Sequence, residues 1–167
     1  HISVCICTYK RPALLRRLLL KLQEIETEGL FRYSLAIVDN DVRESARHVV
    51  ESVARESSVS ILYYVEPEQN IALARNRVVE QSVGDLLAFI DDDEYPNPDW
   101  LVVLYKAMLL YKADGILGPV LPHFEEKPPA WVLKGCFFDR PTHSNGHVLA
   151  WKRSEEHTSE LQSRQSI

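Results

Sequence analysis

The sequence predicts an α/β fold in which helices flank a mostly parallel central sheet. Short apolar runs rich in β-branched residues alternate along the chain with stretches whose apolar residues recur at helical spacing. The apolar run at residues 86–90 ends abruptly in four carboxylates at residues 91–94, as a core strand does when its tip projects into a cleft. The chain has 167 residues, which is enough for one domain with a sizeable core.

The first half of the chain predicts two strands, each followed by a helix. Residues 2–7 form the first β-rich apolar run, and Pro12 suits the first turn of the helix that follows. The apolar stripe of that helix consists of Leu15, Leu18, Leu19, Leu22 and Ile25. Residues 33–38 predict the second strand. The apolar positions of the next helix are Ala46, Val49, Val50 and Val53.

The pattern continues through the second half. Residues 59–65 predict a third strand, Asn70 caps a helix that runs to about residue 82, and residues 86–90 predict the fourth strand. The triplet at residues 97–99 (Asn-Pro-Asp) predicts the start of a helix that ends near residue 112. Residues 115–120 predict a fifth strand, and the proline-rich stretch at residues 119–129 leads into irregular structure.

Charge, hydropathy and cysteine content exclude several classes of protein. The formal net charge of −5 argues against a nucleic-acid binder, which needs a basic face. No apolar run reaches the roughly 18 residues that cross a bilayer. Three cysteines make no disulfide framework and predict reduced thiols. We therefore expect a cytoplasmic protein, with the inner face of the membrane as the alternative location.

The composition changes after Trp151. Residues 153–163 resemble the frame translation of a widely used sequencing-library adapter, and no amphipathic period continues there. We therefore treat residues 153–167 as a non-native tail and exclude them from the fold, as for an expression scar. On this interpretation the natural protein continues beyond about residue 152 and the fold is truncated at its C-terminus.

The polar residues that follow the four predicted strands should meet at one edge of the sheet. Strand–helix–strand repetition implies right-handed crossovers, and ligands of such sheets bind beyond the carboxyl ends of the strands. The polar segments that we expect to converge there are residues 8–11, 39–41, 66–70 and 91–94. All-oxygen ligands suit Mg²⁺ or Mn²⁺, with substrate phosphates completing the shell. The six glycines form no dinucleotide-binding or Walker-type loop, so side chains and a metal would hold the nucleotide.

Four segments together resemble family-2 glycosyltransferases of the GT-A fold. They are ISVCICTYKRP at residues 2–12, IVDN at residues 37–40, QNIALARNR at residues 69–77 and GDLLAFIDDDE at residues 84–94. The resemblance implies a Rossmann-like GT-A sandwich. It assigns residues 1–125 to the nucleotide-sugar-binding half and residues 126–152 to the start of an incomplete acceptor-binding region.

The resemblance also implies a reaction and residue roles. The enzyme would transfer a sugar from a nucleoside diphosphate sugar, most often a UDP-sugar, to an acceptor hydroxyl. The reaction would need a metal ion and would invert the configuration at the anomeric carbon. It would serve polysaccharide or cell-envelope biosynthesis. The general base would lie in the later, acceptor-binding half, so the isolated chain should be inactive.

The implied nucleotide-binding residues are Thr8, Tyr9, Arg11, Asp39, Arg75, Asp91 and Asp92, and the implied metal ligands are Asp91 and Asp93. Asp93 is the stronger metal candidate, and Asp39 would bind the base.

Three other functions compete with the glycosyltransferase interpretation, and the first and third of them stay open as alternatives. A sugar-phosphate nucleotidyltransferase uses a similar sheet and metal, but it usually has a glycine-rich loop after the first strand, where this chain has residues 8–11 (Thr-Tyr-Lys-Arg). A phosphatase of the Asp-x-Asp type needs Thr or Val where Tyr95 stands. A non-enzymatic divalent-cation module of the Ca²⁺-loop type needs Gly at the sixth position, where Pro96 stands.

Overall fold

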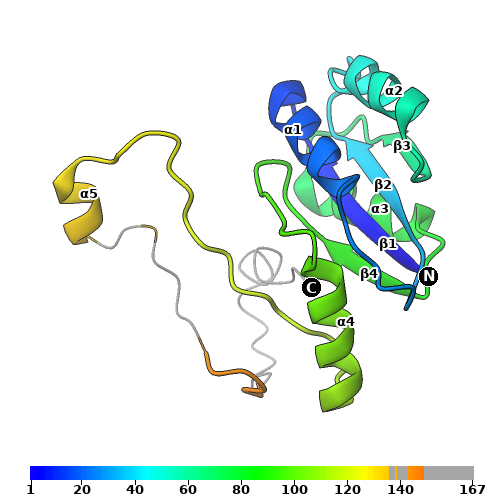
Figure 1. Ribbon diagram of the computed structural model, residues 1–167. Coiled ribbons are helices and arrows are strands. Elements are labelled where there is room, and N and C mark those ends of the chain that lie inside the picture. Colours follow the sequence, from blue (N-terminus) through cyan, green and yellow to red (C-terminus); the bar gives the residue numbers. More distant parts are fainter. Residues whose placement is uncertain (136–137, 139–142, 149–167) are drawn as a thin grey trace, which may run out of the picture.

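A computed structural model describes residues 1–135, 138 and 143–148 of the chain. Four strands, β1 (Ile2–Thr8), β2 (Tyr33–Asp39), β3 (Ile61–Val65) and β4 (Leu86–Phe89), form one sheet in the order β3-β2-β1-β4. All three strand pairs are parallel, and helices lie on both faces of the sheet (Figure 1). The predicted α/β class with a parallel sheet is therefore confirmed. The predicted tail at residues 153–167 lies outside the described residues.

Five helices accompany the strands in the described part of the chain. They are α1 (Pro12–Leu22), α2 (Arg47–Glu56), α3 (Ile71–Gln81), α4 (Trp100–Tyr111) and α5 (Ala130–Gly135). The apolar faces of α1, α2 and α4 pack with the sheet in one large cluster of buried side chains, whereas Ala74 and Val78 of α3 pack on the opposite face. The leucines at positions 15, 18, 19 and 22 of α1 are all fully buried, as the helical stripe predicts.

The strand order creates a switch point next to β1. From β1 the chain crosses over to β2 and then to β3 on one side, and it returns to place β4 on the other side of β1. Thr8 at the end of β1 is in register with Asp39 at the end of β2. The carboxyl ends of the strands thus meet at one edge, and a crevice outside the switch point is the expected ligand position in such a sheet.

Two predicted elements differ from the structure. Residues 115–120 form no strand: Gly115, Gly118 and Pro119 are poor strand formers, and the segment pairs with no described strand. Helix α4 begins at Trp100 rather than at residues 97–98, because Pro98 and Asp99 form a turn in which the Trp100 amide donates to the Asn97 carbonyl at 3.0 Å. Asn70, in contrast, caps α3 as predicted, since its side chain accepts from the Ala72 amide.

Beyond α4 the chain runs away from the sheet to α5, which lies apart from the other elements (Figure 1). None of the helices in the described part of the chain combines the length and the apolar character that a bilayer crossing requires.

Gly84 permits the close approach of the β4 entry to β1. A Cβ atom at this position would lie 2.6 Å from the Ser3 amide nitrogen and 2.9 Å from the Leu86 carbonyl oxygen, both of which are backbone atoms. We expect Gly84→Ala to destabilise the protein by about 1–3 kcal/mol, because the two strands must move apart. Urea unfolding measures this change. Gly115→Ala is the matched control, since a Cβ at Gly115 meets nothing within 4 Å; equal stabilities of the two variants would contradict the packing argument.

Candidate functional site

A pocket of about 440 Å³ opens at the carboxyl ends of β1, β2 and β4. Side chains from the strand tips and from the N-terminal part of α3 line it. The lining residues are Cys7, Thr8, Tyr9, Arg11, Asn40, Gln69, Asn70, Ile71, Arg75, Asp91, Asp92 and Asp93. Six of the seven residues that the sequence assigns to the nucleotide therefore lie around one pocket, as do both candidate metal ligands.

Asp92 is the buried anchor of the acidic turn. The residue is only 5% exposed, and its Oδ2 accepts from the Thr8 hydroxyl at 2.7 Å. Its Oδ1 accepts from Arg11 Nη1 at 3.2 Å. Burial raises the pKa of the Asp92 carboxyl, while the bond from Thr8 and the charge of Arg11 partly oppose that rise. These contacts fix the turn after β4 against the tip of β1.

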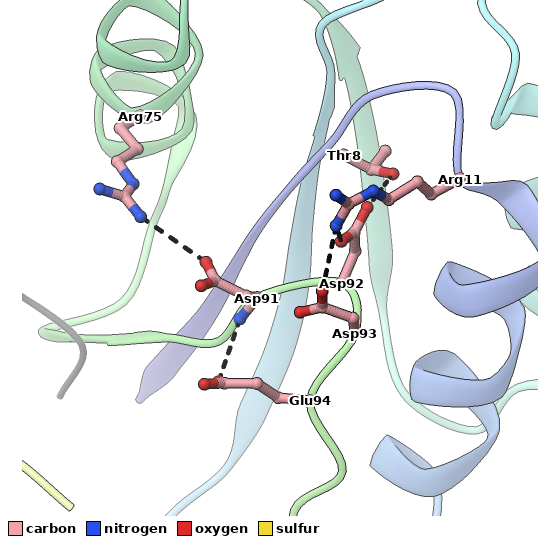
Figure 2. Close-up of polar contacts among 7 residues, drawn as sticks. All are labelled: Thr8, Arg11, Arg75, Asp91, Asp92, Asp93 and Glu94. Carbon is pink, nitrogen blue, oxygen red and sulfur yellow. Dashed lines mark hydrogen bonds and ion pairs between the residues drawn. The ribbon is translucent and has the colours of Figure 1, made fainter. Parts of the chain in front are cut away.

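Asp91 and Asp93 flank this anchor in the sequence, and each of the two carboxylates meets an arginine (Figure 2). Arg11 Nη1 also donates to Asp93 Oδ2 at 3.1 Å, so that one guanidinium nitrogen bridges Asp92 and Asp93. Arg75 of α3 approaches from the other side and lies 3.6 Å from Asp91 Oδ1. The positive charges of the Arg11 and Arg75 guanidiniums thus offset the repulsion among the three adjacent carboxylates.

Asn40 holds the opposite wall of the pocket. Its Nδ2 donates to the Glu66 and Glu68 carbonyls at 2.9 and 2.6 Å, and its Oδ1 accepts from the Asn70 amide at 2.9 Å. The side chain therefore ties the tip of β2 to the loop that leads into α3. Asn40 belongs to the polar segment at residues 39–41 that is predicted at this edge of the sheet, but its bonds to a loop distant in the sequence gave no local signal from which its specific role could be predicted.

Asp39 differs from the other predicted site residues. It is fully buried and is not among the residues that line the pocket. Its Oδ1 accepts from the Asp41 amide at 3.0 Å, and its Oδ2 accepts from the Ala46 amide at 2.7 Å and from the Tyr63 hydroxyl at 2.9 Å. Because Asp39 is fully buried, a contact between its carboxylate and a nucleotide base would require the surrounding loop to move, and the role stays a prediction.

Tyr9 and Cys7 complete the β1 side of the pocket. The Lys10 ammonium lies 4.7 Å from the centroid of the Tyr9 ring, a cation–π arrangement that keeps the aromatic side chain at the pocket rim. Burial raises the pKa of the Cys7 thiol to about 12. Because a protonated thiol is a poor nucleophile, Cys7 contributes shape rather than covalent chemistry.

The donor chemistry of the turn fits a hard divalent cation in part. The Asp91 and Asp93 side chains are 59% and 50% exposed, and each offers oxygen atoms toward the solvent side of the pocket. Within the described ranges, no three His, Cys, Asp or Glu side chains gather closely enough to hold a metal ion alone. This donor set matches an Mg²⁺-type site in which one or two carboxylates act together with substrate phosphates.

A family model described as "Glycosyl transferase family 2" matches residues 3–160, which is nearly the whole chain. The chain belongs to glycosyl transferase family 2. Among its relatives, the succinoglycan biosynthesis protein ExoM of Rhizobium meliloti is 37% identical over 149 residues, which cover 89% of this chain and 48% of ExoM. The glycosyltransferase GlyA of Streptococcus pneumoniae is 24% identical over 117 residues, which cover 70% of this chain and 16% of GlyA. This family 2 chain thus spans at most about half the length of these relatives.

Solved structures share the fold. The crystal structure of S. aureus TarS 1-349 superposes with a TM-score of 0.60 and 20% identity over 75% of this chain and 40% of that TarS chain. The mannosyltransferase PcManGT from Pyrobaculum calidifontis, in complex with GDP-Man and Mn²⁺, superposes with a TM-score of 0.58 and 20% identity over 64% of this chain and 32% of that protein. These likenesses confirm the predicted GT-A-type α/β architecture of the family 2 chain.

Proposed function

We propose that this chain is the donor-binding part of an inverting, metal-dependent glycosyltransferase that moves a sugar from a nucleoside diphosphate sugar to an acceptor hydroxyl. The observation that carries the proposal is the gathering of Asp91, Asp93, Arg11 and Arg75 in one pocket at the switch point of the sheet. Carboxylates for a cation and guanidiniums for phosphate oxygens are the two kinds of group that a metal-bound diphosphate needs.

The relatives support this class of substrate. TarS has been solved with UDP-GlcNAc and with UDP, and PcManGT has been solved with GDP-Man and Mn²⁺. We propose a nucleoside diphosphate sugar as donor, with a UDP-sugar as the first choice, and Mg²⁺ or Mn²⁺ as the cation. The similarity to ExoM, a succinoglycan biosynthesis protein, supports a role in polysaccharide or cell-envelope synthesis.

We assign the residues as follows. Asp93 would ligate the cation, with Asp91 in the same shell or on its water, and Arg11 and Arg75 would bind phosphate oxygens. Thr8 and Tyr9 would lie along the ribose and base, and Asp92 would hold the turn that presents its two neighbours. When bound, the cation would neutralise the charge that develops on the departing diphosphate.

The acceptor half would supply the remaining chemistry. An acceptor hydroxyl needs a general base within hydrogen-bond reach, and the three carboxylates of the pocket are engaged by Thr8, Arg11 and Arg75. We therefore propose that residues 1–125 bind the donor, that residues 126–152 begin the acceptor region, and that the chain alone binds nucleotide without turning it over.

Thermal unfolding with nucleotides tests the proposal. UDP, GDP and dTDP are each added with and without Mn²⁺, and at least one nucleotide with Mn²⁺ should raise the melting temperature. A ligand at 100 times its dissociation constant stabilises a protein by about 2.7 kcal/mol, which corresponds to a shift of several degrees for a domain of this size. Stabilisation by Ca²⁺ alone, without any nucleotide response, would instead favour a cation-binding module and would overturn the proposal.

A further inference from the structure

We infer that Arg11 and Arg75 are built-in counterions that occupy Asp93 and Asp91 in the ligand-free pocket and pass to the phosphates when a metal-bound nucleoside diphosphate enters. The consequence is that a divalent cation alone binds weakly and that cation and diphosphate bind cooperatively. This inference rests on the proposed function, since it concerns the same pocket.

The first support is the pairing itself. Each of the two exposed carboxylates meets an arginine: Asp93 lies 3.1 Å from Arg11, and Asp91 lies 3.6 Å from Arg75. Figure 2 shows that the two guanidiniums approach the acidic turn from opposite sides. A bare cation that approaches either carboxylate therefore encounters a positive charge within a few ångströms of its ligand.

The second support is the difference in burial between the two contacts of Arg11. The Asp92 side chain is 7% exposed and is fixed by the Thr8 hydroxyl, whereas the Asp93 side chain is 50% exposed. Ion pairs at exposed positions contribute little free energy and exchange readily, while a buried partner is costly to abandon. Arg11 can therefore release Asp93 and remain anchored on Asp92. Arg75 can likewise release Asp91, whose side chain is 59% exposed.

The third support is the charge balance of the pocket. Among the residues that line the pocket, three carboxylates at residues 91–93 face two guanidiniums, so the lining carries a single formal negative charge, which is a weak attraction for a divalent cation. In the described part of the chain, no three-ligand group could hold the ion alone. A diphosphate brings additional oxygen ligands for the cation and new anionic partners for the arginines. Binding of either ligand therefore raises the affinity of the pocket for the other ligand. This positive coupling is reciprocal.

The test measures Mn²⁺ and UDP separately. Electron paramagnetic resonance counts free Mn²⁺ in titrations of the full chain, and calorimetry gives the UDP affinity at saturating Mn²⁺. The principal variant is Arg75→Gln, because Arg75 pairs with an exposed carboxylate and its removal leaves the Asp92 anchor intact. Arg11→Gln is the second variant. Arg55→Gln, in the last turn of α2 and not among the pocket residues, is the control with the same change in net charge.

The expected result is a change of opposite sign for the two ligands. Arg75→Gln should bind Mn²⁺ alone about fivefold more tightly than the unsubstituted chain, and it should bind UDP with Mn²⁺ about fivefold more weakly. Arg55→Gln should leave both affinities unchanged. Circular dichroism establishes that each variant is folded.

The outcomes separate the two proposals. If the unsubstituted chain binds no nucleoside diphosphate with Mn²⁺, the proposed function fails and this inference fails with it. If the chain binds UDP with Mn²⁺ but Arg75→Gln does not bind Mn²⁺ alone more tightly, the counterion role is wrong and the proposed function stands. Unchanged UDP affinity in both arginine variants would also overturn the inference, because the arginines would then not pass to the phosphates.

Discussion

Replacing Asp39 by alanine is expected to lower the free energy of unfolding by about 3–5 kcal/mol, a large share of the stability of a typical domain. The Asp39 carboxylate accepts three hydrogen bonds, from the Asp41 and Ala46 amides and from the Tyr63 hydroxyl. Alanine would leave these donors without an acceptor at a position that is fully buried. Urea unfolding followed by circular dichroism measures the loss.

Two further substitutions should lower the free energy of unfolding by smaller amounts. Tyr63→Phe removes one of the three bonds and should lower the free energy of unfolding by about 0.5–1.5 kcal/mol. Asp39→Asn keeps one carbonyl oxygen but turns an amide donor toward other donors, so its effect should fall between those of the other two variants. An Asp39→Ala protein that is no less stable than Tyr63→Phe would show that the loop after β2 does not depend on this carboxylate.

Replacing Asp93 by asparagine is expected to weaken Mn²⁺-dependent binding of UDP by about tenfold to a hundredfold. Asparagine keeps the shape of the side chain but removes the charge that favours a cation, and a charge-assisted contact contributes about 1.5–3 kcal/mol. Isothermal titration calorimetry with UDP at saturating Mn²⁺ measures the affinity. Binding without the metal should change much less.

Asp114→Asn is the matched control for this substitution. Asp114 lies beyond the end of α4, is exposed and does not line the pocket, and its replacement changes the net charge by the same amount. Its affinity for UDP with Mn²⁺ should equal that of the unsubstituted chain. Equal affinities for the Asp93→Asn and Asp114→Asn variants would refute the assignment of Asp93 as a metal ligand.

The sequence predicted the four strands, the helices between them and the meeting of their polar tips with good accuracy. The reason is that these features are local or follow from topology. The apolar stripe that includes Leu22 fixes the buried face of α1, and parallel crossovers bring Thr8 and the residues 91–93 to one edge of the sheet. Asn70 acts as a cap through its own side chain, which is also a local interaction.

The sequence did not predict interactions that depend on a partner distant in the chain. Residues 115–120 have an apolar pattern, but a strand requires a neighbouring strand, and none among the described residues pairs with them. The choice of Asp92 rather than Asp93 as the anchor depends on the position of Thr8 across the sheet. The three hydrogen bonds that the Asp39 carboxylate accepts depend on the loop after β2 and on Tyr63 of β3.

The bond between Thr8 and Asp92 joins residues that are 84 positions apart, and β1 pairs with β2 on one edge and with β4 on the other. During synthesis on the ribosome, β1, β2 and β3 can associate while one edge of β1 still lacks its neighbour. Only after the acidic turn emerges can that edge close and the pocket form. Contacts with so long a sequence separation slow folding. Ligand-binding competence is therefore the last property that the nascent polypeptide acquires from this sheet.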